Sequence, residues 1–101
     1  MLLLLAGCAG GPGGRDKAAV AEVDLFQVRQ AAEASYASKD YAESEKQYTL
    51  LVQKVPVEAE NWFRLGNIYA RSKRPDQAIA AYREALVRAP DNTKAWFNMA
   101  I

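Results

Sequence analysis

Few side chains in this sequence could perform covalent or acid–base chemistry. The 101 residues include no histidine and one cysteine, Cys8, so a Ser/His/Asp triad, a Cys/His pair or a zinc site of the usual ligands cannot be assembled within the chain. Glu43 and Glu45 are close in sequence, but residues two positions apart on a helix point to different faces and cannot act as paired carboxylates. We therefore predict a protein that is not an enzyme and needs neither cofactor nor metal.

Cys8 is the one residue with a distinct chemical prediction. It follows a short apolar run, Leu2 to Leu5, and two small residues. The sequence Leu-Ala-Gly-Cys resembles the lipobox of bacterial lipoprotein precursors, in which the signal peptide is removed before a cysteine whose sulfur carries a diacylglyceryl group. The resemblance implies that Cys8 anchors the chain and, since Ala9 rather than aspartate follows, that the anchor lies on the periplasmic side of the outer membrane. The alternative is an apolar tail with an incidental thiol.

Composition and charge narrow the class of partner. The net charge is only +1, from 13 Lys plus Arg against 12 Asp plus Glu, which gives no electrostatic reason to propose nucleic acid. Half of the residues are hydrophobic and a quarter are charged, as expected of one folded domain with a packed core. The apolar run at the N-terminus is too short for a transmembrane helix.

Apolar residues recur at three- and four-residue steps, which predicts an all-α chain. Asp40 suits an N-cap with Glu43 at the N3 position of a capping box, Pro75 suits the first position of a helix, and Asp91 and Asn92 offer further caps. The predicted helices cover residues 18–38, 41–54, 59–72 and 75–89, and a fifth begins near 93.

The segment from Ala59 to Asn92 carries a pattern that repeats. Its order and spacing resemble a tetratricopeptide repeat (TPR) of about 34 residues, carried by Trp62, Leu65, Gly66, Tyr69, Ala78, Tyr82, Ala85 and Pro90. One period earlier the pattern reaches Tyr48, Leu51 and Pro56, and one period later Trp96, Met99 and Ala100. The resemblance implies an α-solenoid of antiparallel helical hairpins with about two and a half repeats.

This reading divides the chain into two parts. Residues 1–17 are a partial lipoprotein signal with a Gly-rich tether, and residues 18–101 are the repeat domain. Within that domain, residues 25–58 form a divergent repeat, 59–92 a complete one and 93–101 the start of a third. Trp62, Leu65 and Tyr69 are expected to pack against Ala78, Tyr82 and Ala85, with Gly66 and Ala78 allowing the two helices to approach closely.

In TPR proteins the first helix of each repeat lines a concave groove. The resemblance assigns this lining to Phe26, Arg29, Glu33, Tyr36, Glu60, Phe63, Arg64, Asn67, Arg71, Lys94, Phe97 and Asn98. Guanidinium groups suit a peptide carboxylate, aromatic faces suit apolar side chains, and asparagine can pair with an extended backbone. We predict partner binding by Arg29, Tyr36, Phe63, Arg64, Asn67, Arg71, Lys94 and Asn98.

Two alternatives accompany this prediction. The arginines could be solvated helix residues, and Phe63 could cover the neighbouring repeat. Chaperone-binding TPR proteins use a carboxylate clamp of Lys, Asn and Arg in the groove, but here Glu33 stands at one Asn position, so that specificity is not assigned.

The function implied is a protein- or peptide-binding module tethered to the cell envelope. The alternative is a structural assembly factor of a secretion or pilus complex, like the pilotin and Flp-pilus TPR lipoproteins. The apolar residues from Trp96 to Ile101 have no following helix in the sequence, so we expect either a longer TPR protein or a homodimer through this end. A dimer would give twice the monomer mass by light scattering.

Overall fold

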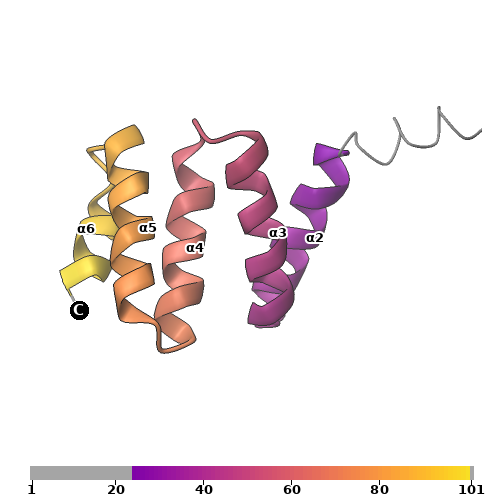
Figure 1. Cartoon of the computed structure of the whole chain (residues 1–101), viewed down its shortest axis with the longest axis horizontal. Coiled ribbons are helices and arrows are strands. Elements are labelled where there is room, and N and C mark those ends of the chain that lie inside the picture. Colours follow the sequence, from indigo (N-terminus) through magenta and orange to yellow (C-terminus); the bar gives the residue numbers. More distant parts are fainter. Residues whose placement is uncertain (1–23, 101) are drawn as a thin grey trace, which may run out of the picture.

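The structure is a computed structural model that describes residues 24–100. These residues form five consecutive α-helices: α2 (Leu25–Ala37), α3 (Tyr41–Lys54), α4 (Ala59–Arg71), α5 (Pro75–Arg88) and α6 (Thr93–Ala100). Figure 1 shows α2 and α3 as one hairpin, α4 and α5 as the next, and α6 beside α5. The predicted all-α fold of stacked hairpins is confirmed. Residues 18–23 of the predicted first helix, Cys8 and the proposed tether lie outside the described residues.

Side-chain caps fix where three helices begin. Asp24 Oδ1 accepts from the backbone N–H of Phe26 at 3.1 Å before α2, and Asn92 Oδ1 accepts from Ala95 N–H at 3.0 Å before α6. Asp40 Oδ1 accepts from Glu43 N–H at 3.3 Å before α3. Each cap satisfies an N–H group that has no partner within its own helix.

Only half of the predicted capping box forms at α3. The Glu43 carboxylate accepts a hydrogen bond from Gln47 at 2.5 Å instead of reaching back to the Asp40 backbone. The Asp40 N–H donates to the carbonyl of Ser35 at 2.9 Å. The end of the preceding helix has therefore already satisfied the donor that the box would use.

The turn inside each hairpin has the same unusual backbone. Lys39 and Lys73 have φ of 66° and 62°, the left-handed region that glycine usually occupies at a helix end. In both turns the N–H after the lysine donates to a carbonyl five residues earlier, from Asp40 to Ser35 and from Arg74 to Tyr69, each at 2.9 Å. This is the Schellman pattern, formed here at a cost of roughly 1 kcal/mol for a residue with a Cβ.

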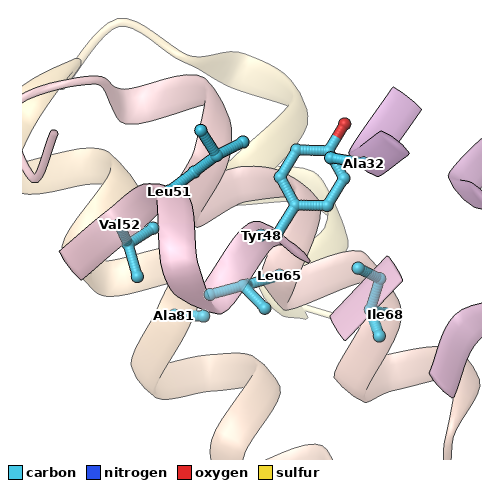
Figure 2. Close-up of a cluster of buried hydrophobic side chains, with 7 residues drawn as sticks. All are labelled: Ala32, Tyr48, Leu51, Val52, Leu65, Ile68 and Ala81. Atoms are coloured by element: carbon cyan, nitrogen blue, oxygen red, sulfur yellow. The ribbon is translucent and has the colours of Figure 1, made fainter. Parts of the chain in front are cut away.

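Two hydrophobic clusters hold the hairpins together. The first joins both hairpins and is drawn in Figure 2; its buried residues are Ala32, Tyr48, Leu51, Val52, Leu65, Ile68 and Ala81. The second joins α4, α5 and α6 through Phe63, Ala78, Tyr82, Ala85, Leu86 and Ala95. Leu65 therefore lies in the cluster that joins the two hairpins, together with Ala81 of α5 and residues of α2 and α3, whereas it was predicted to pack against the facing helix α5. Trp62 and Tyr69 contact both clusters.

Gly66 makes room for an aromatic ring of the facing helix. A Cβ added at Gly66 would lie 2.4 and 2.5 Å from two ring carbons of Tyr82, closer than carbon atoms can pack. The equivalent pair in the first hairpin is Ala32 and Tyr48, both fully or almost fully buried. Gly66 thus lies in close contact with α5, and its nearest neighbour there is the Tyr82 ring.

Candidate functional site

One face of the molecule brings together predicted groove residues from α2, α4 and α6. Asn67 Nδ2 donates to the hydroxyl of Tyr36 at 2.9 Å, and Asn98 Nδ2 donates to Asn67 Oδ1 at 3.0 Å. The guanidinium of Arg64 lies 4.5 Å above the centre of the Tyr36 ring, within the range of an attractive cation–π contact. Asn67 is thus the central link of a polar chain that crosses three helices.

Two tyrosines complete this face, and their contribution to it was not predicted. Tyr82 was assigned only to packing, yet its hydroxyl donates to Asn67 Oδ1 at 2.5 Å. Tyr41 was not assigned at all, and its hydroxyl accepts from Arg71 Nη1 at 3.2 Å. Burial raises the pKa of the Tyr82 hydroxyl above its ordinary value, so this hydroxyl is a neutral donor at pH 7. The sequence signal for Tyr82 was present, since a tyrosine in a buried stripe needs a partner for its O–H.

The polar chain borders a hollow at the α6 side. The hollow has a volume of about 170 Å³ and is lined by Asn67, Ala70, Arg71, Tyr82 and Asn98. Arg71 is exposed, and its guanidinium has donors left over after the bond to Tyr41. An exposed guanidinium beside an amide can receive a carboxylate.

A second hollow lies at the α2 side of the same face. It has a volume of about 110 Å³ and is lined by Arg29, Glu33, Tyr48, Leu51, Glu58, Glu60, Asn61 and Arg64. Arg29 donates two hydrogen bonds to the Glu58 carboxylate, at 2.7 and 2.8 Å, and Asn61 adds a third at 2.8 Å. These bonds, that from Arg29 first, hold the pKa of the Glu58 carboxyl below its usual value.

Comparison with known proteins identifies the repeat. The family model described as the tetratricopeptide repeat matches residues 59–92. The fold is a TPR solenoid. Among solved structures, the chain is similar to the structure described as the complex of the TPR2B domain of yeast Sti1 with pHsp70. That match has a TM-score of 0.70 at 20% sequence identity and covers 75% of this chain and 61% of the other. No curated protein matches the sequence.

Phe63 is placed differently from the other predicted groove residues. It is only 8% exposed, and its ring centre lies 5.9 Å from that of Tyr82. It belongs to the cluster that joins α4 and α5 to Ala95 of α6. Phe63 therefore covers the neighbouring repeat, as the alternative prediction stated. Its burial corrects the prediction that it is a partner-binding side chain.

The other residues predicted to bind a partner differ in their contacts and in their exposure to solvent. Arg29 is tied to Glu58 and is 39% exposed at its side chain, while Lys94 is exposed at the start of α6. Trp96 and Phe97 of α6 are 54% and 68% exposed. The face formed by α2, α4 and α6 therefore presents Tyr36, Arg64, Arg71 and Asn98, and hydrogen bonds hold Asn67 among them.

Residues 24–100 contain no group of three or more His, Cys, Asp or Glu side chains that could hold a metal ion. Among the same residues, no helix combines the length and the apolar character needed to cross a membrane.

Proposed function

We propose that this TPR chain is a non-catalytic interaction module that binds an extended peptide segment of a partner protein along the face formed by α2, α4 and α6. The observation that carries the proposal is the hollow at the α6 side, where Arg71 and Asn98 meet around the fixed amide of Asn67. Arg71 supplies charge for an acidic side chain or a terminal carboxylate, and the Asn98 amide supplies pairing for the peptide backbone.

The polar chain explains why this surface suits binding. Asn67 accepts from both Tyr82 and Asn98 and donates to Tyr36, so its orientation is set before a ligand arrives. A preformed surface loses less conformational entropy on binding. The similarity to the TPR2B domain, whose structure is described as a complex with pHsp70, supports a protein or peptide partner. Glu33 at a groove position argues against assigning the same partner here.

The proposal is tested by replacing one arginine on the proposed binding face and one exposed arginine on α5 with glutamate, in separate variants. Arg71→Glu should weaken binding of fluorescein-labelled peptides with a free C-terminal carboxylate by about 10-fold or more, because a hydrogen bond to a charged group contributes roughly 1.5–3 kcal/mol. Fluorescence anisotropy over a small peptide library measures this. Arg83→Glu is the matched control, because Arg83 is exposed on α5 and carries the same charge change. Equal affinities of the two variants would contradict the proposal.

We also propose that the chain is tethered at the periplasmic side of a bacterial outer membrane through a lipid on Cys8. The support is the sequence Leu-Ala-Gly-Cys and the Gly-rich stretch after it, which suits a flexible tether. When the chain is expressed with its native upstream sequence, Cys8→Ser should abolish incorporation of labelled palmitate and shift the protein from the membrane to the soluble fraction. Labelling that survives the substitution would rule out this anchor.

A further inference from the structure

Two of three equivalent positions carry different residues in successive repeats, and the third is tyrosine in both. In the second, Asn67 of α4, Tyr82 of α5 and Asn98 of α6 are joined by hydrogen bonds at 2.5 and 3.0 Å. One repeat earlier the equivalent residues are Glu33 of α2, Tyr48 of α3 and Arg64 of α4. No hydrogen bond joins these three to one another. We call the first set the closed trio and the second the open trio.

Tyr48 is the unusual member of the open trio. It is 3% exposed, it lines the 110 Å³ hollow, and its hydroxyl makes no hydrogen bond within residues 24–100. Figure 2 shows its ring extending from α3 with the hydroxyl beside Ala32 of α2. Burial raises the pKa of this hydroxyl, so at pH 7 it is neutral and can both donate and accept. Ser44 Oγ is the only buried side-chain polar atom of the described residues that lacks a partner, so the Tyr48 oxygen is open to the hollow that this residue lines and is free to accept from a ligand group there.

Charges around the hollow favour a cation. Arg29 is paired with Glu58 and Arg64 with Glu60, which leaves the carboxylate of Glu33 without an ion-pair partner in the described chain. Arg64 is also turned toward the Tyr36 ring. Three carboxylates and two guanidinium groups line this space, so it has one excess negative charge.

We propose that the hollow between α2, α3 and α4 is a subsite for a lysine side chain of the bound peptide. The ammonium group would donate to the Glu33 carboxylate and to the Tyr48 hydroxyl oxygen. An ammonium has three donors and a compact head, which suits a space of about 110 Å³ better than the broad planar guanidinium of arginine. The inference rests on the proposed function and adds an orientation of the bound peptide. A lysine of the peptide lies at the α2 side of the groove and an acidic group at the α6 side.

The test uses four capped tripeptides, Ac-Gly-X-Gly-NH2 with X as Lys, Arg, Gln or Glu, added to the isotopically labelled full chain and followed by NMR. The Lys peptide should give saturable shifts at the amides of Glu33, Tyr48 and Arg64, and the Gln peptide should give none there. Shifts of equal size from the Lys and Gln peptides would overturn the subsite. Arg peptide binding at least as tight as that of the Lys peptide would overturn the assignment to lysine.

Three variants sharpen the result. Glu33→Gln should weaken the Lys peptide about 10-fold, whereas the control Glu84→Gln, which removes the same charge on α5, should leave its affinity unchanged. The double change of Glu33 and Arg64 to asparagine reproduces the residues of the closed trio and should abolish binding of the Lys peptide while the fold is retained by circular dichroism. Wild-type affinity in Glu33→Gln or in the double variant would overturn the proposal.

The Glu peptide separates this inference from the function on which it rests. It should shift the amides of Arg71 and Asn98 at the other end of the groove. Shifts at Arg71 from the Glu peptide with none at Glu33 from the Lys peptide would overturn the lysine subsite and leave the proposed function standing. No shift at either end would overturn both.

Discussion

Replacing Gly66 with alanine is expected to destabilise the protein by about 2 kcal/mol, although alanine is normally the better helix former by about 1 kcal/mol. The reason is steric: the new Cβ would lie 2.4 Å from a ring carbon of Tyr82, and that ring is 2% exposed in a packed cluster. The ring can move away only by disturbing its hydrogen bond to Asn67. Urea unfolding followed by circular dichroism measures the change in the free energy of unfolding.

The first hairpin supplies the control for this substitution. Ala32 and Tyr48 occupy the same two positions there, and both are buried in one cluster. Ala32→Gly should destabilise the protein by roughly 0.5–1 kcal/mol, because the helix loses alanine and gains nothing in packing. If Gly66→Ala instead unfolds at a higher urea concentration than the wild type, Tyr82 is not the rigid neighbour that the structure describes.

Ser44→Ala is expected to stabilise the protein by about 1–2 kcal/mol. Ser44 is 0% exposed, and its hydroxyl oxygen has no hydrogen-bond partner in the described residues. Alanine removes an unsatisfied buried group and forms helix more readily. Ala78 already occupies the equivalent position in the second hairpin and is 3% exposed there. Thermal and urea unfolding of the variant should both shift upward.

Ser35 tests whether the effect comes from the missing partner. It too is buried, at 8% exposure, but its hydroxyl donates to the carbonyl of Ala31 at 2.7 Å and lies 3.1 Å from that of Ala32. Ser35→Ala should therefore give a clearly smaller gain than Ser44→Ala. Equal gains for the two substitutions would show that helix propensity alone explains the result.

The helices could be predicted from the sequence because their signals are local. Pro75 marks the first residue of α5, as predicted, and Asp40 caps α3 through Glu43 N–H. The turns at Lys39 and Lys73 gave no comparable signal, since lysine rarely adopts the left-handed backbone found there. Their shape is imposed by the packing of the helices that they connect.

The groove was harder to predict because its chemistry depends on contacts between repeats. Helical spacing places Phe63 and Asn67 on one side of α4, but it does not say that α6 covers Phe63 while Asn67 joins three other side chains. The hydrogen bonds that join the closed trio and are missing from the open trio likewise become apparent only when residues of three helices are considered together. Such differences arise from side-chain packing, which a pattern in one helix does not contain.

The two tryptophan side chains also allow unfolding of the repeats to be followed by intrinsic fluorescence. Trp62 donates through Nε1 to the carbonyl of Pro56 at 3.0 Å, and Trp96 makes the matching bond to Pro90 at 3.1 Å. These are the only tryptophans in the sequence, so each one probes the connection between two successive repeats. The guanidinium of Arg88 lies 4.8 Å from the Trp62 ring centre, which gives that indole a different environment. Fluorescence of single-tryptophan variants would therefore reveal whether the repeats melt together or in sequence.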